Sequence, residues 1–173
     1  MSKRASDTKI VIRTYRPSDL SVCRELYLQL VQWHRQLYHD PTIGEPDPCS
    51  GLMNHLREHG EENLWVAETE GVIVGLVGLV FKDDEAEVEP LLVAESHRRQ
   101  GIGVQLLRHV TGIARKAGVR YLNVRPVARN WQAIQFYYAA GFRTLGFIEL
   151  FQDLRGEFKN EPGPEILGIP FDW

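Results

Sequence analysis

The sequence has few of the residues that mark several common classes of protein. It contains only two cysteines, Cys23 and Cys49, in 173 residues. A disulfide-stabilised secreted domain needs more cysteines in a shorter chain, and this pair lacks the spacing of a metal site. Every apolar run is shorter than the roughly 20 residues that cross a bilayer. The first residues are polar and contain no apolar signal segment. We therefore expect a cytoplasmic protein without a membrane partner.

The sequence also has no excess of positive charge. Its 23 acidic residues outnumber its 20 lysines and arginines, which gives a formal net charge of -3. A protein that binds nucleic acid through its overall field needs the opposite balance, so we expect no nucleic-acid partner. The length and a hydrophobic content of 43% suffice for one domain with a buried core. We predict a single domain over residues 1–173, with its core over about 10–154 and a tail over 155–173 that packs on the body.

The hydrophobic pattern predicts strands and helices in a mixed order. Short β-branched and apolar runs predict strands over 9–15, 64–69, 72–81, 86–93 and 119–127. Helical spacing and capping residues predict helices over 17–38, 51–60, 104–118 and 130–142. We expect two more short strands within 141–154 and an irregular segment after them. Strands that first follow one another and then alternate with helices predict an α/β or α+β fold, in which helices cover both faces of a mixed sheet.

The most informative stretch is H-R-R-Q-G-I-G at residues 97–103, between a predicted strand and a predicted helix. The first turn of a helix has N–H groups without partners and a partial positive charge, so it can bind a phosphate. Gly101 and Gly103 allow close approach to the main chain, and Arg98 and Arg99 can add charged contacts. The third glycine of a dinucleotide-binding motif and the lysine of a Walker motif are missing. The stretch fits a diphosphate site or an ordinary solvated turn.

The surrounding residues resemble the GNAT superfamily of acyl-CoA-dependent N-acetyltransferases. Residues 89–107, E-P-L-L-V-A-E-S-H-R-R-Q-G-I-G-V-Q-L-L, resemble its motif A, and Arg98, Gly101 and Gly103 occupy the characteristic positions. Residues 130–142, N-W-Q-A-I-Q-F-Y-Y-A-A-G-F, resemble its motif B. The two motifs lie in the order and at a distance similar to those of the family, and the resemblance covers most of residues 10–154.

The resemblance implies a largely antiparallel sheet that splays into a V between its fourth and fifth strands. It implies acetyl-CoA as the co-substrate in this opening, with its diphosphate on the main-chain N–H groups of residues 99–104, and no metal. The implied cofactor-binding residues are Leu91, Leu92, Val93, Arg98, Arg99, Gln100, Gly101, Ile102, Gly103, Val104, Asn130, Ala133 and Phe136. For Asn130, an N-cap role at the start of the last helix explains the residue equally well.

Transfer of an acetyl group to an amine needs a base, a donor to the thioester oxygen and an acid. Glu87 and Glu89 share a face of the predicted strand, so either could take the proton of the amine, although both could simply face solvent. A main-chain N–H at Leu92 or Val93 could stabilise the oxygen. The resemblance gives Tyr137 the role of the acid, and a phenol with a pKa near ~10 can donate at neutral pH.

The acceptor is expected to be a small-molecule or peptide amine. Tyr27, His34, Tyr38, Glu45 and Asp47 could face it, and the acidic residues would suit a cationic amine such as a polyamine, an aminoglycoside or a protein N-terminus. The segment over 40–50 that carries both acids fits a substrate entrance or a plain connector. The family resemblance makes a homodimer plausible, with the C-terminal tail supplying contacts.

Other functions fit parts of the sequence. Residues 55–59, H-L-R-E-H, match a zinc-protease pattern, but Gly60 follows at once and no third ligand is marked, so we expect two exposed histidines. A non-catalytic module that senses acyl-CoA would need the turn at 98–104 but neither Tyr137 nor a glutamate. Transfer of a longer acyl group is a further alternative. The predicted function is N-acetyl transfer from acetyl-CoA to a primary amine by direct attack in a ternary complex.

Overall fold

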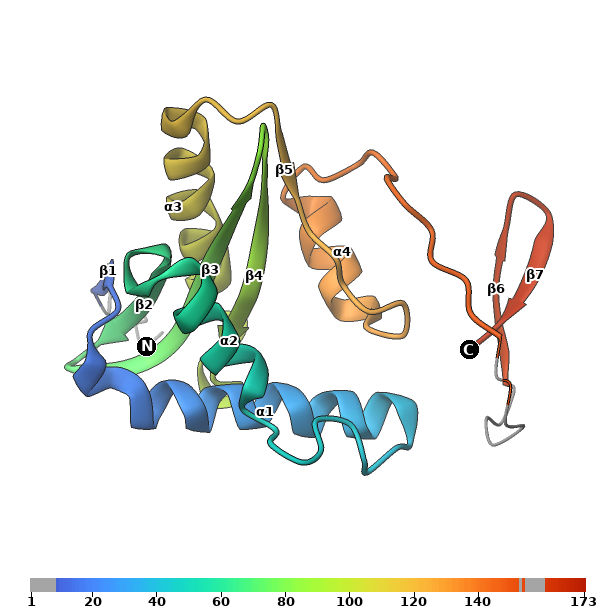
Figure 1. The fold of residues 1–173 in the computed structure, drawn as a ribbon, viewed down its shortest axis with the longest axis horizontal. Coiled ribbons are helices and arrows are strands. Elements are labelled where there is room, and N and C mark those ends of the chain that lie inside the picture. Colours follow the sequence, from blue (N-terminus) through green and yellow to red (C-terminus); the bar gives the residue numbers. More distant parts are fainter. Residues whose placement is uncertain (1–8, 153, 155–160) are drawn as a thin grey trace, which may run out of the picture. The chain divides into compact units, whose positions relative to one another are not determined.

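The computed structural model describes residues 9–152, 154 and 161–173, which form two compact units that meet in the sequence at Arg125 and Pro126 (Figure 1). The first unit contains most of the regular structure. Its elements are β1 (Ile10–Thr14), α1 (Leu20–Tyr38), α2 (Ser50–His59), β2 (Leu64–Thr69), β3 (Val72–Lys82), β4 (Glu85–Val93), α3 (Ile102–Ala117) and β5 (Tyr121–Asn123). Short 3-10 turns cover Pro17–Asp19, Glu61–Asn63 and Glu95–His97.

The five strands form one sheet in the order β1-β2-β3-β4-β5. All neighbours are antiparallel except β4 and β5, which are parallel, so the expectation of a mixed and largely antiparallel sheet is confirmed. The pairing of β4 with β5 runs only from Glu85 opposite Tyr121 to Glu87 opposite Asn123. Because β4 continues to Val93, the two strands part after Glu87, as a splayed sheet requires.

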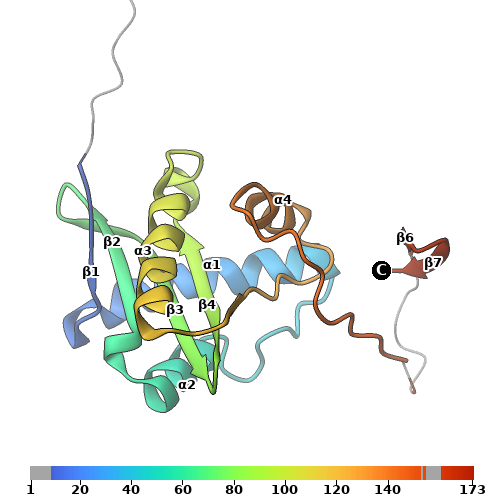
Figure 2. The same cartoon turned by 90° about the horizontal axis from the view of Figure 1, so that it is seen from above.

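Helices cover both faces of this sheet, and the alternation along the strands explains why. On one face, apolar side chains of β2, β3 and β4 form a buried cluster with α1 and α2; its members are Tyr15, Cys23, Leu26, Leu52, Leu64, Val66, Leu76 and Leu92. On the other face, α3 buries its apolar stripe, which consists of Ile102, Leu106, Leu107, Val110 and Ala114. Figure 2 shows α3 and α1 on either side of the strands.

The second unit contains α4 (Trp131–Ala139) and a hairpin of β6 (Pro162–Ile166) and β7 (Ile169–Asp172). The expectation of an irregular tail is wrong for this hairpin. Leu167 and Gly168 both have positive φ, which is the backbone geometry of a tight hairpin turn. Leucine is an unusual residue for such a turn, so the residue types at 167–168 did not indicate a hairpin. The predicted packing of the tail on the body stays a prediction, and residues 155–160 lie outside the described part.

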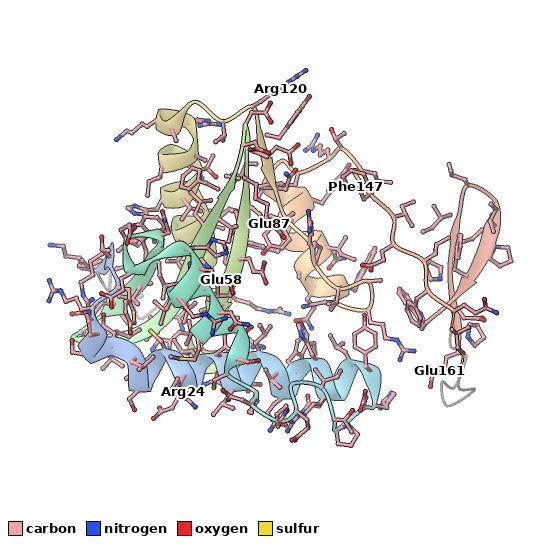
Figure 3. All side chains as sticks on the ribbon, in the orientation of Figure 1. Arg24, Glu58, Glu87, Arg120, Phe147 and Glu161 are labelled. Atoms are coloured by element: carbon pink, nitrogen blue, oxygen red, sulfur yellow. The ribbon has the colours of Figure 1, made fainter. Side chains whose placement is uncertain are left out.

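Two other predictions of secondary structure are wrong in the same part of the chain. The described residues of 141–154 contain no strand, and their apolar side chains, such as Phe147 in Figure 3, are largely exposed. The apolar residues of this segment indicated strands, but a strand forms only where a partner supplies its hydrogen bonds. The predicted strand over 119–127 is reduced to β5 for the same reason, because β4 pairs with only Tyr121–Asn123.

Candidate functional site

The turn between β4 and α3 has the geometry that the sequence predicts. Arg99 and Gly101 both have positive φ, at +61° and +81°, which reverses the chain before the helix. Ile102 is buried and anchors the first turn of α3 against the sheet. The first helical hydrogen bond runs from the N–H of Gln105 to the carbonyl of Gly101, so the N–H groups of residues 102–104 precede the helical pattern. Among the described side chains none caps this end, which leaves these donors for an anion or water.

The polar side chains of this turn are arranged around open space. The position that a Cβ would occupy on Gly101 has no atom within 4 Å. Arg98 donates from Nε to the carbonyl of Val93 at 3.3 Å, and Gln100 donates from Nε2 to the carbonyl of Ser96 at 3.3 Å. Arg99 is exposed. The structure therefore brings residues 98–104 together in a basic turn between the Glu95–His97 turn and α3.

A groove beside this turn was missed by sequence reasoning. It has a volume of about 290 Å³ and lies between α1 and the Glu95–His97 turn. Gln29 closes one part of it by accepting a hydrogen bond from the main-chain N–H of Glu95 at 3.3 Å. Its lining residues are Leu28, Gln29, Gln32, Trp33, Gln36, Glu95 and Arg98. A face of glutamines on a helix reads as solvated surface in the sequence, so only the packing of the turn against α1 reveals a groove.

The strand β4 carries a bulge in the middle of the predicted site. Val77 pairs with Leu91 and Leu79 with Val88, so Gly78 alone lies opposite Glu89 and Pro90. A Cβ on Gly78 would clash with the carbonyl oxygen of Glu89 and with the ring of His55. Glycine is therefore required at the point where α2 and the bulge approach β3.

The bulge gives the two candidate bases different environments. The carboxylate of Glu87, whose position Figure 3 marks, is nearly buried. Each of its oxygens lies near a cation: Oε2 is 3.1 Å from Lys82 Nζ and Oε1 is 3.5 Å from Arg125 Nε. Glu89 lies within the bulge and is exposed. On a regular strand, side chains two residues apart share a face, so the sequence predicts equivalent environments for the two glutamates. The irregular register at the bulge makes their environments different.

Glu89 interacts electrostatically with Tyr27, one of the residues predicted to face the acceptor. Burial raises the pKa of the Tyr27 phenol, and the negative charge of Glu89 raises it further. The hydroxyl of Tyr27 also lies against Gly51, where a Cβ would clash with it. Residues of α1 and α2 therefore meet at Tyr27, whose protonated phenol lies in the electrostatic field of the Glu89 carboxylate on the β4 bulge.

The two acidic residues predicted near the acceptor, Glu45 and Asp47, both accept hydrogen bonds from neighbouring parts of the chain. Glu45 accepts a hydrogen bond from Arg35 at 3.2 Å, and Arg35 also donates to the carbonyl of Ile43. Asp47 accepts from the main-chain N–H of Cys49 at the start of α2. His34 is partly buried, which lowers its pKa. The loop is thus held by contacts with α1 and with the start of α2, and both of its predicted acids take part in them.

The histidines of the H-x-x-E-H pattern correct another expectation. His55 is only 5% exposed, because α2 turns it toward the sheet and against Gly78. Its Nε2 lies 3.1 Å from the carbonyl oxygen of Asn63, and its ring contacts that of His59. The expectation of two exposed histidines is therefore wrong for His55. Within the described ranges, no group of three or more His, Cys, Asp or Glu side chains could hold a metal ion.

The candidate acid lies in the second unit, on α4. Tyr137 makes edge-on contacts with the rings of Phe136 and Phe142, at centroid distances of 5.1 and 5.8 Å. Burial raises the pKa of Tyr137 to about 12, so its phenol stays protonated at neutral pH. At the start of the helix, Asn130 accepts a hydrogen bond from the N–H of Ala133 at 3.1 Å, which confirms its N-cap role.

Comparison with known proteins gives the class of protein. The model of the acetyltransferase (GNAT) family matches residues 25–142, so this chain belongs to the GNAT family. N-acetyltransferase family 8 member 2 of Rattus norvegicus is 32% identical over 141 residues, which cover 76% of this chain and 61% of that protein. The chain spans about half the length of the curated relatives it matches.

Solved structures confirm the fold. The PaiA N-acetyltransferase of Thermoplasma acidophilum in complex with coenzyme A has a TM-score of 0.65 and 22% identity, and the match covers 78% of this chain and 90% of that one. N-acetylglutamate synthase of Neisseria gonorrhoeae, with coenzyme A and N-acetylglutamate, has a TM-score of 0.62 and 19% identity over 82% of this chain and 30% of that one. Among the described helices, none is long and apolar enough to cross a membrane.

Proposed function

We propose that this chain transfers an acetyl group from acetyl-CoA to a primary amine by direct attack of the amine in a ternary complex. Membership of the acetyltransferase family gives the class of reaction, and two of the structural neighbours contain coenzyme A. The observation that carries the proposal is the turn over 98–104, where an uncapped helix N-terminus, open space at Gly101 and two arginines fit a diphosphate.

The second part of the cofactor site is the half of β4 that β5 does not cover. The N–H of Ala94 donates to Val74 on β3 at 2.8 Å, and N–H groups along a strand alternate in direction. The N–H groups of Leu91 and Val93 therefore point away from β3, toward the side where β5 has left the sheet. A pantetheine arm, which contains two amides, can pair there like an additional strand. For Ala133 and Phe136 of α4, the family resemblance alone supports a role in binding the cofactor.

We assign the base to Glu89 and not to Glu87. A base must be free to accept a proton, and Glu89 is exposed, whereas both oxygens of Glu87 lie next to cations. Glu89 would take the proton of the ammonium form of the acceptor, directly or through one water. The neutral amine then attacks the thioester carbon and a new C–N bond forms. As the C–S bond breaks, the nitrogen gives its second proton to water, and the Tyr137 phenolate left after protonation of the thiolate regains a proton from water.

Two further groups complete the proposed chemistry. The outward N–H of Val93 is the donor for the thioester oxygen, which gains negative charge during the attack. Tyr137 donates its proton to the departing thiolate, a role that the raised pKa of its phenol supports because the proton is present at neutral pH. Acetyl-CoA supplies the acyl group and the leaving thiol, and no metal takes part in this proposal.

We further propose that residues 1–173 form one acetyltransferase domain, because the family match runs across the division at residue 125. The acceptor is a small-molecule or peptide amine, cationic before it reaches Glu89. Among the structural neighbours, one is a complex with N-acetylglutamate and another is named ribosomal-protein-S18-alanine N-acetyltransferase. A cytoplasmic location and a homodimer stay predictions from the sequence.

The test is release of free CoA thiol from acetyl-CoA with a panel of primary amines. We expect Glu89→Gln to lower kcat by about 10²- to 10⁴-fold and to remove the rise of kcat with pH, whereas Glu87→Gln keeps that rise. Tyr137→Phe should lower kcat while the affinity for acetyl-CoA stays the same. Binding of acetyl-CoA without turnover of any amine would favour a non-catalytic module that senses acyl-CoA. Faster thiol release from longer acyl-CoA substrates would favour transfer of a longer acyl group.

A further inference from the structure

The place where β4 and β5 separate is built from a cluster of charged and amide side chains. Glu87 and Asn123 are the last residues that the two strands pair. Asn123 donates from Nδ2 to Oε2 of Glu85 at 2.9 Å, which ties the same strands together one step earlier. Arg125 follows two residues after Asn123 and reaches back to Glu87. Each of these contacts lies within the first unit.

The carboxylate of Glu87 is the centre of this cluster. Its side chain is only 6% exposed, while the side chains of Lys82 and Arg125 are 55% and 64% exposed. A carboxylate so well removed from water is stable only with charged partners. Lys82 is the last residue of β3, so its contact stays on the antiparallel side of β4. Arg125 is the contact that links β4 to the chain leaving β5.

We propose that Glu87 is a positioning residue whose ion pair with Arg125 fixes the point where β4 and β5 separate. The strand β5 has only three residues, and so short a parallel pairing is weak without side-chain support. The inference rests on the proposed function in one respect, because acetyl-CoA would enter between these two strands. In that site, Glu87 sets the width of the opening, and Glu89 performs the chemistry on the same strand.

Five variants separate this role from a merely structural one. Glu87→Gln and Arg125→Gln each remove the ion pair, and the double variant tests whether the two residues act together. Lys82→Gln is the matched control, since it removes the other cation from the same carboxylate without touching β5. Arg125→Lys keeps the charge and should largely restore the behaviour of the wild type.

The first measurement is amide hydrogen exchange of the protein without ligand. We expect residues 121–124 to exchange about tenfold faster in Glu87→Gln and in Arg125→Gln, with the double variant no faster than either single one. Lys82→Gln and Arg125→Lys should stay close to wild type. Unchanged exchange in Arg125→Gln, or an equal increase in Lys82→Gln, would overturn the proposal.

The second measurement is the dissociation constant of acetyl-CoA. We expect it to rise about tenfold in Glu87→Gln and Arg125→Gln and to stay unchanged in Lys82→Gln. The pH dependence of kcat keeps its shape in Glu87→Gln, because the base is elsewhere; loss of that dependence would make Glu87 the base and end this proposal. If the wild type does not bind acetyl-CoA, the proposed function fails, and the exchange measurement still decides the role of the ion pair.

Discussion

Gly78→Ala tests the bulge that presents Glu89, because it adds one methyl group at the most crowded point of the sheet. The new Cβ would overlap the carbonyl oxygen of Glu89 and lie 2.6 Å from Cε1 of His55. The carbonyl belongs to the backbone of β4 and cannot rotate away. The ring of His55 is buried and bonded to the carbonyl of Asn63, so it cannot move freely either.

The expected magnitude follows from these two obstacles. Overpacking of a well-packed site costs about 1–3 kcal/mol, and a clash with backbone belongs at the upper end. Replacing glycine by alanine also restricts the unfolded chain, which returns about 0.4–1 kcal/mol. We therefore expect Gly78→Ala to lower the free energy of unfolding by about 2 kcal/mol. Because the bulge must shift to admit the methyl group, kcat for thiol release should fall as well.

Gly112→Ala is the matched control for this substitution. Gly112 lies inside α3, and the position of its missing Cβ has no neighbour within 4 Å. The same chemical change should raise the free energy of unfolding by roughly 1 kcal/mol there, since alanine is the better helix former. Urea unfolding followed by circular dichroism measures both variants. A Gly78→Ala protein as stable as the wild type, or a shift of both variants in the same direction, would refute the reasoning.

Two further predictions concern the turn and the buried histidine. Arg99→Gly should stabilise the fold by about 0.5–1 kcal/mol, because glycine adopts φ of +61° without strain. The same substitution should weaken acetyl-CoA binding about tenfold, because a charged contact is lost. If urea unfolding and calorimetry show that stability and affinity both rise or both fall, the reasoning is contradicted. Burial lowers the pKa of His55, so folding favours its neutral form and the protein should lose stability as pH falls below about 6.5, by up to about 1.4 kcal/mol per pH unit. Urea unfolding between pH 5 and 8 checks this, with His59→Gln as the control, and an identical pH dependence in His55→Gln would contradict it.

Structural features that depend on nearby residues could be predicted from the sequence. The turn over 97–103 could be placed because glycine, a helix start and a preceding apolar strand each leave a clear local signal. The first four strands follow from short β-branched and apolar runs, and the helix N-cap at Asn130 follows from its residue type. These features depend on a few consecutive residues and on the periods of helix and strand.

Features that depend on distant parts of the chain were missed or misjudged. The different environments of Glu87 and Glu89 come from a bulge, which exists only because β3 and β4 pair in a particular register. The burial of His55 depends on how α2 meets Gly78, and the groove beside Trp33 depends on the packing of α1 against a turn far along the chain. The alternating pattern over 141–154 resembles a strand, but no strand partner is supplied within the described residues.

The central claim is that the β4–α3 turn binds the diphosphate of acetyl-CoA, and isothermal titration calorimetry of two glycine variants tests it most directly. Gly101 and Gly71 both have positive φ, at +81° and +77°, and a Cβ on either would meet nothing within 4 Å. An aspartate at either position therefore introduces similar backbone strain, but only at 101 does it place a negative charge at the helix N-terminus. We predict that wild type and Gly71→Asp bind acetyl-CoA and that Gly101→Asp does not. Equal binding by both variants, or no binding by the wild type, would contradict the account.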